Sequence, residues 1–156
     1  MHVDNSSTGH AGAAILAAGL ACGVLDITAA FVNWGLKGVA PTRVLQGIAT
    51  GLLGRSSFEG GWSTAALGLA CHFLVAFTAT TVFYLASRRV PFLTNRPFVA
   101  GPLFGIAVYL VMYWIVIPLS RQRPAPFSWT ATITAILIHI VCVGTPIALA
   151  VRHYSY

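Results

Sequence analysis

Charged residues are scarce in this chain of 156 residues. Three residues are acidic and nine are Lys or Arg, so charged residues make up 8% of the sequence, against about a quarter in soluble domains. The chain therefore has too little polar surface to cover a soluble globule. It also lacks a Walker loop, a nucleophile elbow and an HExxH motif. The sequence therefore contains none of these common motifs of soluble enzymes, and we expect the protein not to be an enzyme.

Cysteine is also rare. Cys22, Cys71 and Cys142 lie in three different apolar runs, and no CxxC pair occurs. This spacing predicts neither a structural disulfide nor a zinc or redox site. We expect the three side chains to pack as small apolar groups.

Apolar residues make up 57% of the chain and form four long runs, at residues 11–36, 64–86, 98–119 and 129–151. A helix rises about 1.5 Å per residue, so each run can cross about 30 Å of hydrocarbon. The sequence predicts an all-α fold: a single membrane domain, residues 1–156, built as a bundle of four transmembrane helices. A cleaved signal peptide is the alternative for the first run. We expect a retained helix because no Lys or Arg precedes the run and it exceeds a usual signal core.

Four crossings place both termini and the second loop on one side, called side A, and the first and third loops on the other, side B. The four tryptophans all fall near side B, and three tyrosines fall near side A, as interfacial aromatic belts require. Side A carries four basic residues and side B five, and the pair Arg88 and Arg89 in a short loop favours a cytoplasmic side A. The net charge of +6 is spread over loops, which favours attraction to anionic lipid headgroups over nucleic-acid binding.

The first loop contains a further helical pattern at residues 41–54. Pro41 suits a first helical turn, and apolar residues recur at helical spacing after it. We predict a short amphipathic helix lying at the side-B interface and bracing the first two long helices. A re-entrant hairpin entering the bundle is the alternative, because Gly47, Gly51 and Gly54 permit close packing.

Small residues mark the expected helix contacts. Helices in lipid associate through close contact of small side chains, so small residues four apart predict an interface. The first run has Gly19 and Gly23 at this spacing, and the third has Gly101 and Gly105. Gly68 lies on the same face of the second run as His72. We expect all these faces to point inward.

Asp26 is the only acid within a predicted span. A carboxylate near mid-membrane costs several kcal/mol unless it is neutralised, paired or hydrated. Counting from side B places Asp26 and His139 roughly 15 Å deep and His72 roughly 12 Å deep. The sequence therefore predicts one intramembrane polar cluster of these three residues. Its expected supporting residues are Cys22 and Asn33 on the face of Asp26, Tyr109 and Met112 on the third helix, and Cys142 on the fourth.

Three functions remain open for this layer. The Asp/His cluster could relay protons or gate a small cation. The layer could instead be purely structural, in an accessory or scaffold membrane protein. Alternatively, His72 and His139 could hold haem or, with Asp26, a metal ion in a redox protein; no cofactor is predicted outright.

Two stretches, FVNWGLKGVAPTRVLQ at residues 31–46 and GPLFGIAVYLVMYWIVIPLS at residues 101–120, resemble uncharacterised bacterial inner-membrane proteins of the YagU type. The resemblance implies a four-helix, multi-pass protein of the bacterial inner membrane and a loose link with acid resistance. This chain lacks the basic N-terminal tail of that family, which affects the predicted orientation. The expected partners are the lipid bilayer and a second copy or another membrane protein, with no nucleic acid.

Overall fold

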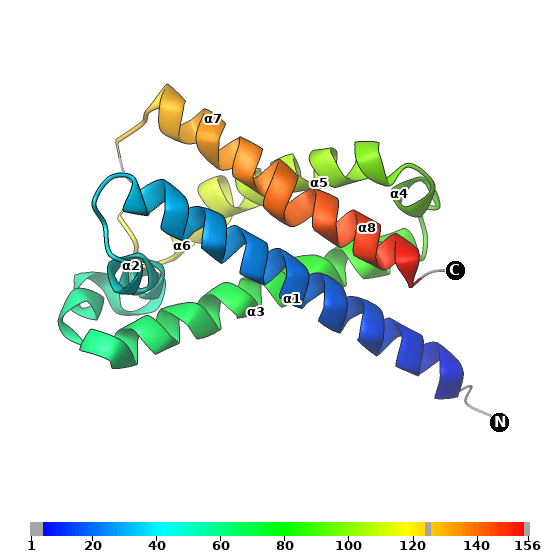
Figure 1. Ribbon diagram of the computed structural model, residues 1–156, viewed down its shortest axis with the longest axis horizontal. Helices are drawn as coiled ribbons and strands as arrows, with labels where there is room; N and C mark the ends of the chain where they lie inside the picture. The colour runs from blue at the N-terminus through cyan, green and yellow to red at the C-terminus, as the bar shows by residue number, and fades with distance from the viewer. Residues whose placement is uncertain (1–4, 124–125, 155–156) are drawn as a thin grey trace.

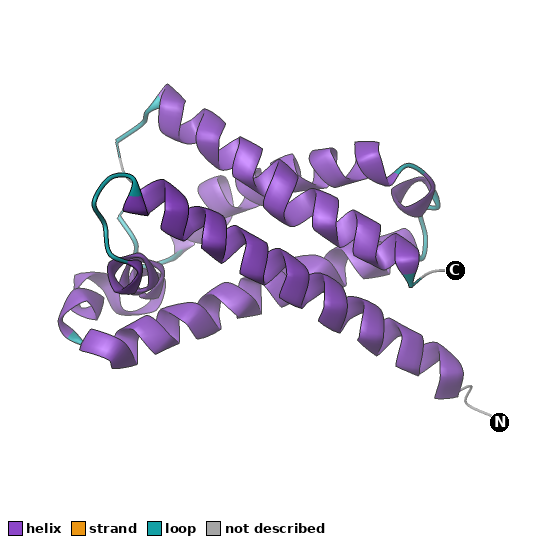
Figure 2. Cartoon of the chain, viewed as in Figure 1, coloured by secondary structure: helices purple, strands orange, loops and turns teal. Residues whose placement is uncertain are grey.

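The computed structural model describes residues 5–123 and 126–154, and of residues 5–10 only the backbone. Within these ranges the chain forms helices joined by short connections and no strand (Figure 2). Four helical stretches are long and apolar enough to cross a membrane: Ala11–Gly35, Gly61–Ser87, Pro97–Leu119 and Trp129–His153. The predicted all-α fold and the four long apolar helices are confirmed, with boundaries that agree to within three residues.

The connections lie at opposite ends of the long helices. Helix α1 (Asn5–Gly35) leads through α2 (Pro41–Leu53) and η1 (Gly54–Glu59) into α3 (Gly61–Ser87), and α4 (Phe92–Asn95) leads into the third long helix. Figure 1 shows α2 at one end of the molecule and α4 at the other, the end at which α1 begins and α8 ends. This up-and-down order agrees with the predicted division into sides A and B.

The third and fourth long helices each contain a π-helical turn. The third consists of α5 (Pro97–Val111), η2 (Met112–Val116) and α6 (Ile117–Leu119), and the fourth of α7 (Trp129–Ile138), η3 (His139–Gly144) and α8 (Thr145–His153). Each wide turn ends just before a proline, Pro118 or Pro146. A proline ring clashes with the carbonyl four residues back. The wider turn relieves that clash, and the N–H groups of Ile117 and Thr145 bond five residues back instead of four.

The long helices pack around a small core. Helix α1 lies against α3 on one side and against η3 and α8 on the other, and α5 packs on η3 and α8. Phe83, Ile147 and Val151 are fully buried, and the Phe83 ring meets the Phe104 ring of α5 at 4.9 Å. Many large apolar side chains point outward, including Leu74, which is 68% exposed. The outer surface of the bundle is therefore largely apolar.

The predicted helix at residues 41–54 is confirmed as α2, which ends at Leu53. It packs closely on α3, because a Cβ at Gly68 would overlap the Leu45 carbonyl group. The backbone N–H of Arg121 donates to the Gly51 carbonyl at 2.9 Å, which ties α2 to the end of the third long helix. The first loop thus braces the second and third long helices, and Gly68 faces this brace.

Candidate functional site

The structure brings Asp26 of α1 and His72 of α3 together. Nδ1 of His72 lies 3.9 Å from Oδ2 of Asp26, and the side chains are 11% and 23% exposed, respectively. Among the described side chains, this is the one acidic–basic pair within 4.0 Å. A gap of 3.9 Å exceeds a direct hydrogen bond, and a small side-chain rotation or a bridging water closes it.

His72 is anchored through its other ring nitrogen. Nε2 lies 2.8 Å from the carbonyl oxygen of Gly23, three residues before Asp26 on α1. The neighbouring Phe73 ring stands edge-on to the imidazole at 5.5 Å and covers Gly23, where a Cβ would lie 2.5 Å from the ring. The absence of a side chain at Gly23 therefore lets α3 approach the α1 backbone at the level of the pair.

The Gly23 contact determines where the ring carries its hydrogen. A carbonyl oxygen only accepts hydrogen bonds, so Nε2 of His72 must be the donor. In a neutral ring, Nδ1 would then turn its lone pair toward the Asp26 carboxylate, which is repulsive. One proton between Nδ1 and Oδ2 removes the repulsion, either as imidazolium beside carboxylate or as imidazole beside carboxylic acid. The arrangement can therefore hold a single transferable proton.

His139 lies in a different environment. Its Nδ1 donates to the Ala135 carbonyl of its own helix at 2.8 Å, since that oxygen can only accept. Its ring meets Tyr109 edge-on at 5.7 Å, and Tyr109 stacks on Tyr113 at 5.8 Å. No hydrogen bond or ion pair joins His139 to Asp26 or His72 in the described ranges. Of the three predicted cluster residues, the structure pairs two and places the third against the aromatic residues of α5.

The predicted supporting residues fall into two groups. Cys22 is buried on α1 one turn from Asp26, and Cys142 is half-buried in η3. Asn33 and Met112 are half-buried, and their side chains make no hydrogen bond in the part of the chain that the structure describes. Of these four residues, Cys22 is the one that lies within a helical turn of the pair, and no hydrogen bond among described residues links Asn33 or Met112 to it.

The glycines of the packing motifs have identifiable neighbours. Gly19 and Gly23 receive the rings of Phe77 and Phe73 from α3. Gly101 and Gly105 of α5 lie against the backbone of the fourth long helix, where a Cβ at Gly105 would overlap the His139 carbonyl. Gly144, which the sequence reasoning did not single out, meets both Gly101 and Gly105. The sequence signal that could have identified Gly144 as a contact residue was its position two residues before Pro146.

The histidines offer limited ligation chemistry. His72 retains only Nδ1, which faces Asp26, and His139 retains only Nε2, because the other nitrogen of each ring bonds a backbone carbonyl. Among described residues, no group of three or more His, Cys, Asp or Glu side chains lies close enough to hold a metal ion. The three-ligand metal site considered from sequence thus has no counterpart in the described geometry.

A second polar cluster, at the side-B end, was missed by sequence reasoning. Gln46 of α2 is 5% exposed and donates to the Gly61 carbonyl at 3.0 Å. Ser57 donates to the Gln46 carbonyl at 3.0 Å, and Thr64 donates to the Ser57 carbonyl at 2.6 Å. Arg43 completes this cap cluster by donating to the Phe58 carbonyl at 3.1 Å. The cluster satisfies loop carbonyls and fixes α2 on α3, which is a structural role.

Comparison with known proteins adds no assignment. No protein-family model, no curated protein and no solved structure matches this chain.

Proposed function

We propose that this chain is a multi-pass protein of the bacterial cytoplasmic membrane that handles protons through the Asp26–His72 pair. Four long apolar helices and an outward-facing apolar surface support the membrane location, since lipid is the solvent that such a surface suits. We also propose that the chain is related to YagU-type proteins and that side A faces the cytoplasm.

The observation that carries the proposal is the position of His72 between a carbonyl and a carboxylate. The Gly23 carbonyl engages Nε2, so Nδ1 faces Asp26 and the pair needs one proton to avoid repulsion. In surroundings of low dielectric constant, the neutral pair with one proton is the least costly state. Arrival of a second proton makes the pair cationic, and one of the two protons then leaves.

Net proton transfer across the membrane follows if the second proton arrives from one side of the membrane and a proton leaves to the other side. Asp26 is the more exposed partner of the pair at 23%, and the proposal requires that water reach its carboxyl. A bundle of four helices is small for a transporter, so we propose that the working unit contains more than one copy or a membrane-protein partner.

An accessory or scaffold role is the second candidate. The bonding of His139 within its own helix and the cap cluster both serve rigidity. In a scaffold, the Asp26–His72 pair would fix the position of α3 on α1 and would move no proton.

The deciding experiment measures proton flux into liposomes with an enclosed pH dye. Asp26→Asn removes the acid from the pair while keeping its shape, and we expect flux to fall to the level of empty liposomes. Glu59→Gln is the matched control, because it removes the same charge from an exposed loop acid, and it should leave flux unchanged. Equal flux from wild type and Asp26→Asn would refute proton handling and leave the scaffold role.

A further inference from the structure

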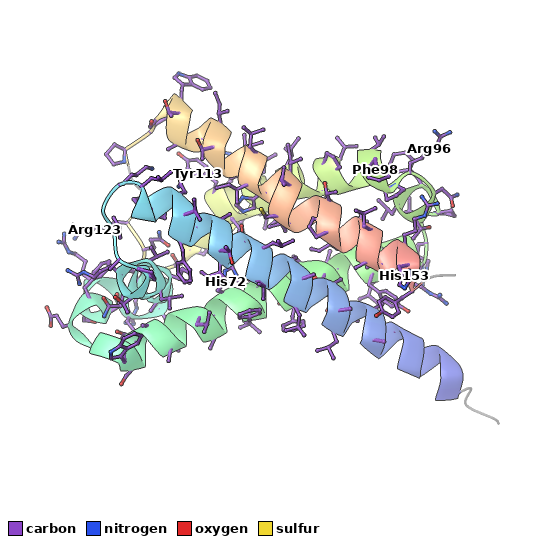
Figure 3. All side chains as sticks on the ribbon, viewed as in Figure 1. His72, Arg96, Phe98, Tyr113, Arg123 and His153 are labelled. Carbon is purple, nitrogen blue, oxygen red and sulfur yellow. The ribbon has the colours of Figure 1, made fainter. Side chains whose placement is uncertain are left out.

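The side-A end of the bundle contains a cavity of about 200 Å³ that the proton proposal does not use. Two arginines reach it from different helices: Arg96 at the start of α5 and Arg152 in the last turn of α8. Figure 3 shows Arg96 beside Phe98 at the same end of the molecule as His153. The remaining lining residues are Asn95, Pro97, Phe98 and Val99.

The charge at this end is positive and uncompensated among described residues. Neither Arg96 nor Arg152 makes an ion pair with a described side chain. Arg88 and Arg89 lie at the same end, and no acidic residue of the described ranges does. Two arginines at one cavity match an anion with several acceptor oxygens, and a phosphate group suits the planar, bidentate hydrogen bonding of arginine.

The apolar part of the lining points to a lipid as the source of that phosphate. Phe98 is 72% exposed and Val99 is 50% exposed, and they lie two and three residues after Arg96 in the chain. A free phosphate ion makes no favourable contact with this apolar surface. A phospholipid uses both parts, because its phosphate can lie between the arginines while its acyl chain runs along Phe98 and Val99.

We propose that Arg96 and Arg152 form a binding site for the phosphate of an anionic phospholipid, with Phe98 and Val99 contacting the acyl chain. The site holds one lipid headgroup between α5 and α8 at the level where the membrane surface lies. The proposal rests on the membrane location proposed above and is independent of the proton step, because its test reads lipid binding and not flux.

The test is a titration of detergent-solubilised protein with short-chain phosphatidylglycerol, followed by the melting temperature. We expect saturable stabilisation of the wild type. The R96Q/R152Q variant should bind at least about tenfold more weakly, because two charge-assisted contacts are lost. R88Q/R89Q is the matched control: it removes the same charge from the same end without touching the cavity lining, and its affinity should stay within about twofold of wild type.

Three outcomes would overturn the proposal. Equal weakening in both double variants would mean attraction by overall charge, and the same stabilisation by inorganic phosphate would mean a site for free phosphate. Absence of saturable stabilisation in the wild type would exclude the site altogether. Phe98→Ala provides a second variant without a charge change, should R96Q/R152Q fold poorly. It should weaken the binding of phosphatidylglycerol and leave the response to inorganic phosphate unchanged.

Discussion

Nε2 of His72 lies 2.8 Å from the carbonyl oxygen of Gly23, so a side chain of α3 is held by the backbone of α1. The same contact orients Nδ1 toward Asp26. The geometry of the proposed proton site therefore depends on a residue without a side chain, and this dependence can be tested.

Gly23→Ala should disturb the pair through Phe73. The added Cβ would lie 2.5 Å from the Phe73 ring, so that ring must move, and it stands edge-on against the His72 imidazole. We expect the free energy of unfolding to fall by about 1–3 kcal/mol, measured by denaturant titration in detergent micelles. Gly12→Ala on the same helix meets no atom within 4 Å and is the control. If both variants were equally stable, close packing at Gly23 would be disproved.

The two membrane histidines should differ in function. His72→Gln can still donate to the Gly23 carbonyl but cannot carry a proton at the Nδ1 position, so we expect folded protein without flux. His139→Gln changes a ring held by Ala135 and Tyr109, away from the pair, and should retain flux. The liposome assay with both variants measures this difference. Equal loss of flux would mean that all three polar residues act as one unit.

Gly144→Ala should separate the third and fourth long helices. An added Cβ would overlap the Gly101 carbonyl and approach the Gly105 backbone, and backbone atoms cannot move aside as a ring can. We expect a loss of about 3 kcal/mol in the free energy of unfolding. Gly47→Ala in α2 meets no atom within 4 Å and should be neutral or slightly stabilising. A Gly144→Ala variant as stable as wild type would contradict the close helix contact.

The cap cluster should contribute stability and no activity. Gln46→Leu removes the hydrogen bond from Gln46 to the Gly61 carbonyl, which keeps only its bond from Thr64 among side chains, and we expect a loss of about 0.5–1.5 kcal/mol in the free energy of unfolding. Amide hydrogen exchange should rise in α2 and at the start of α3, while proton flux per folded molecule stays unchanged. Gln122→Leu replaces an exposed glutamine in the third loop and is the control. Unchanged exchange in Gln46→Leu would show that the cluster does not fix α2.

Periodicity and length were sufficient to predict the helices. Four uninterrupted apolar runs can satisfy their backbone groups in lipid only as helices, so the ends of the four long stretches followed from the sequence to within three residues. The helix at Pro41 followed from its proline and its apolar spacing. The π-helical turns were not predicted, although Pro118 and Pro146 were visible signals for them.

The sequence by itself determined the class of fold, the number of long helices and the need of Asp26 for a partner, because these follow from local composition and the cost of burying a charge. Similar depth in the membrane did not show which histidine pairs with Asp26, because depth does not specify how each helix is rotated about its axis. Tertiary packing determines the partner. The Phe73 and Phe77 rings pack on Gly23 and Gly19, and this contact orients His72 toward Asp26. The wide turn at His139 and the glycine contacts of α5 hold the other ring against Tyr109. Both choices depend on the shape of neighbouring helices, which no single segment encodes.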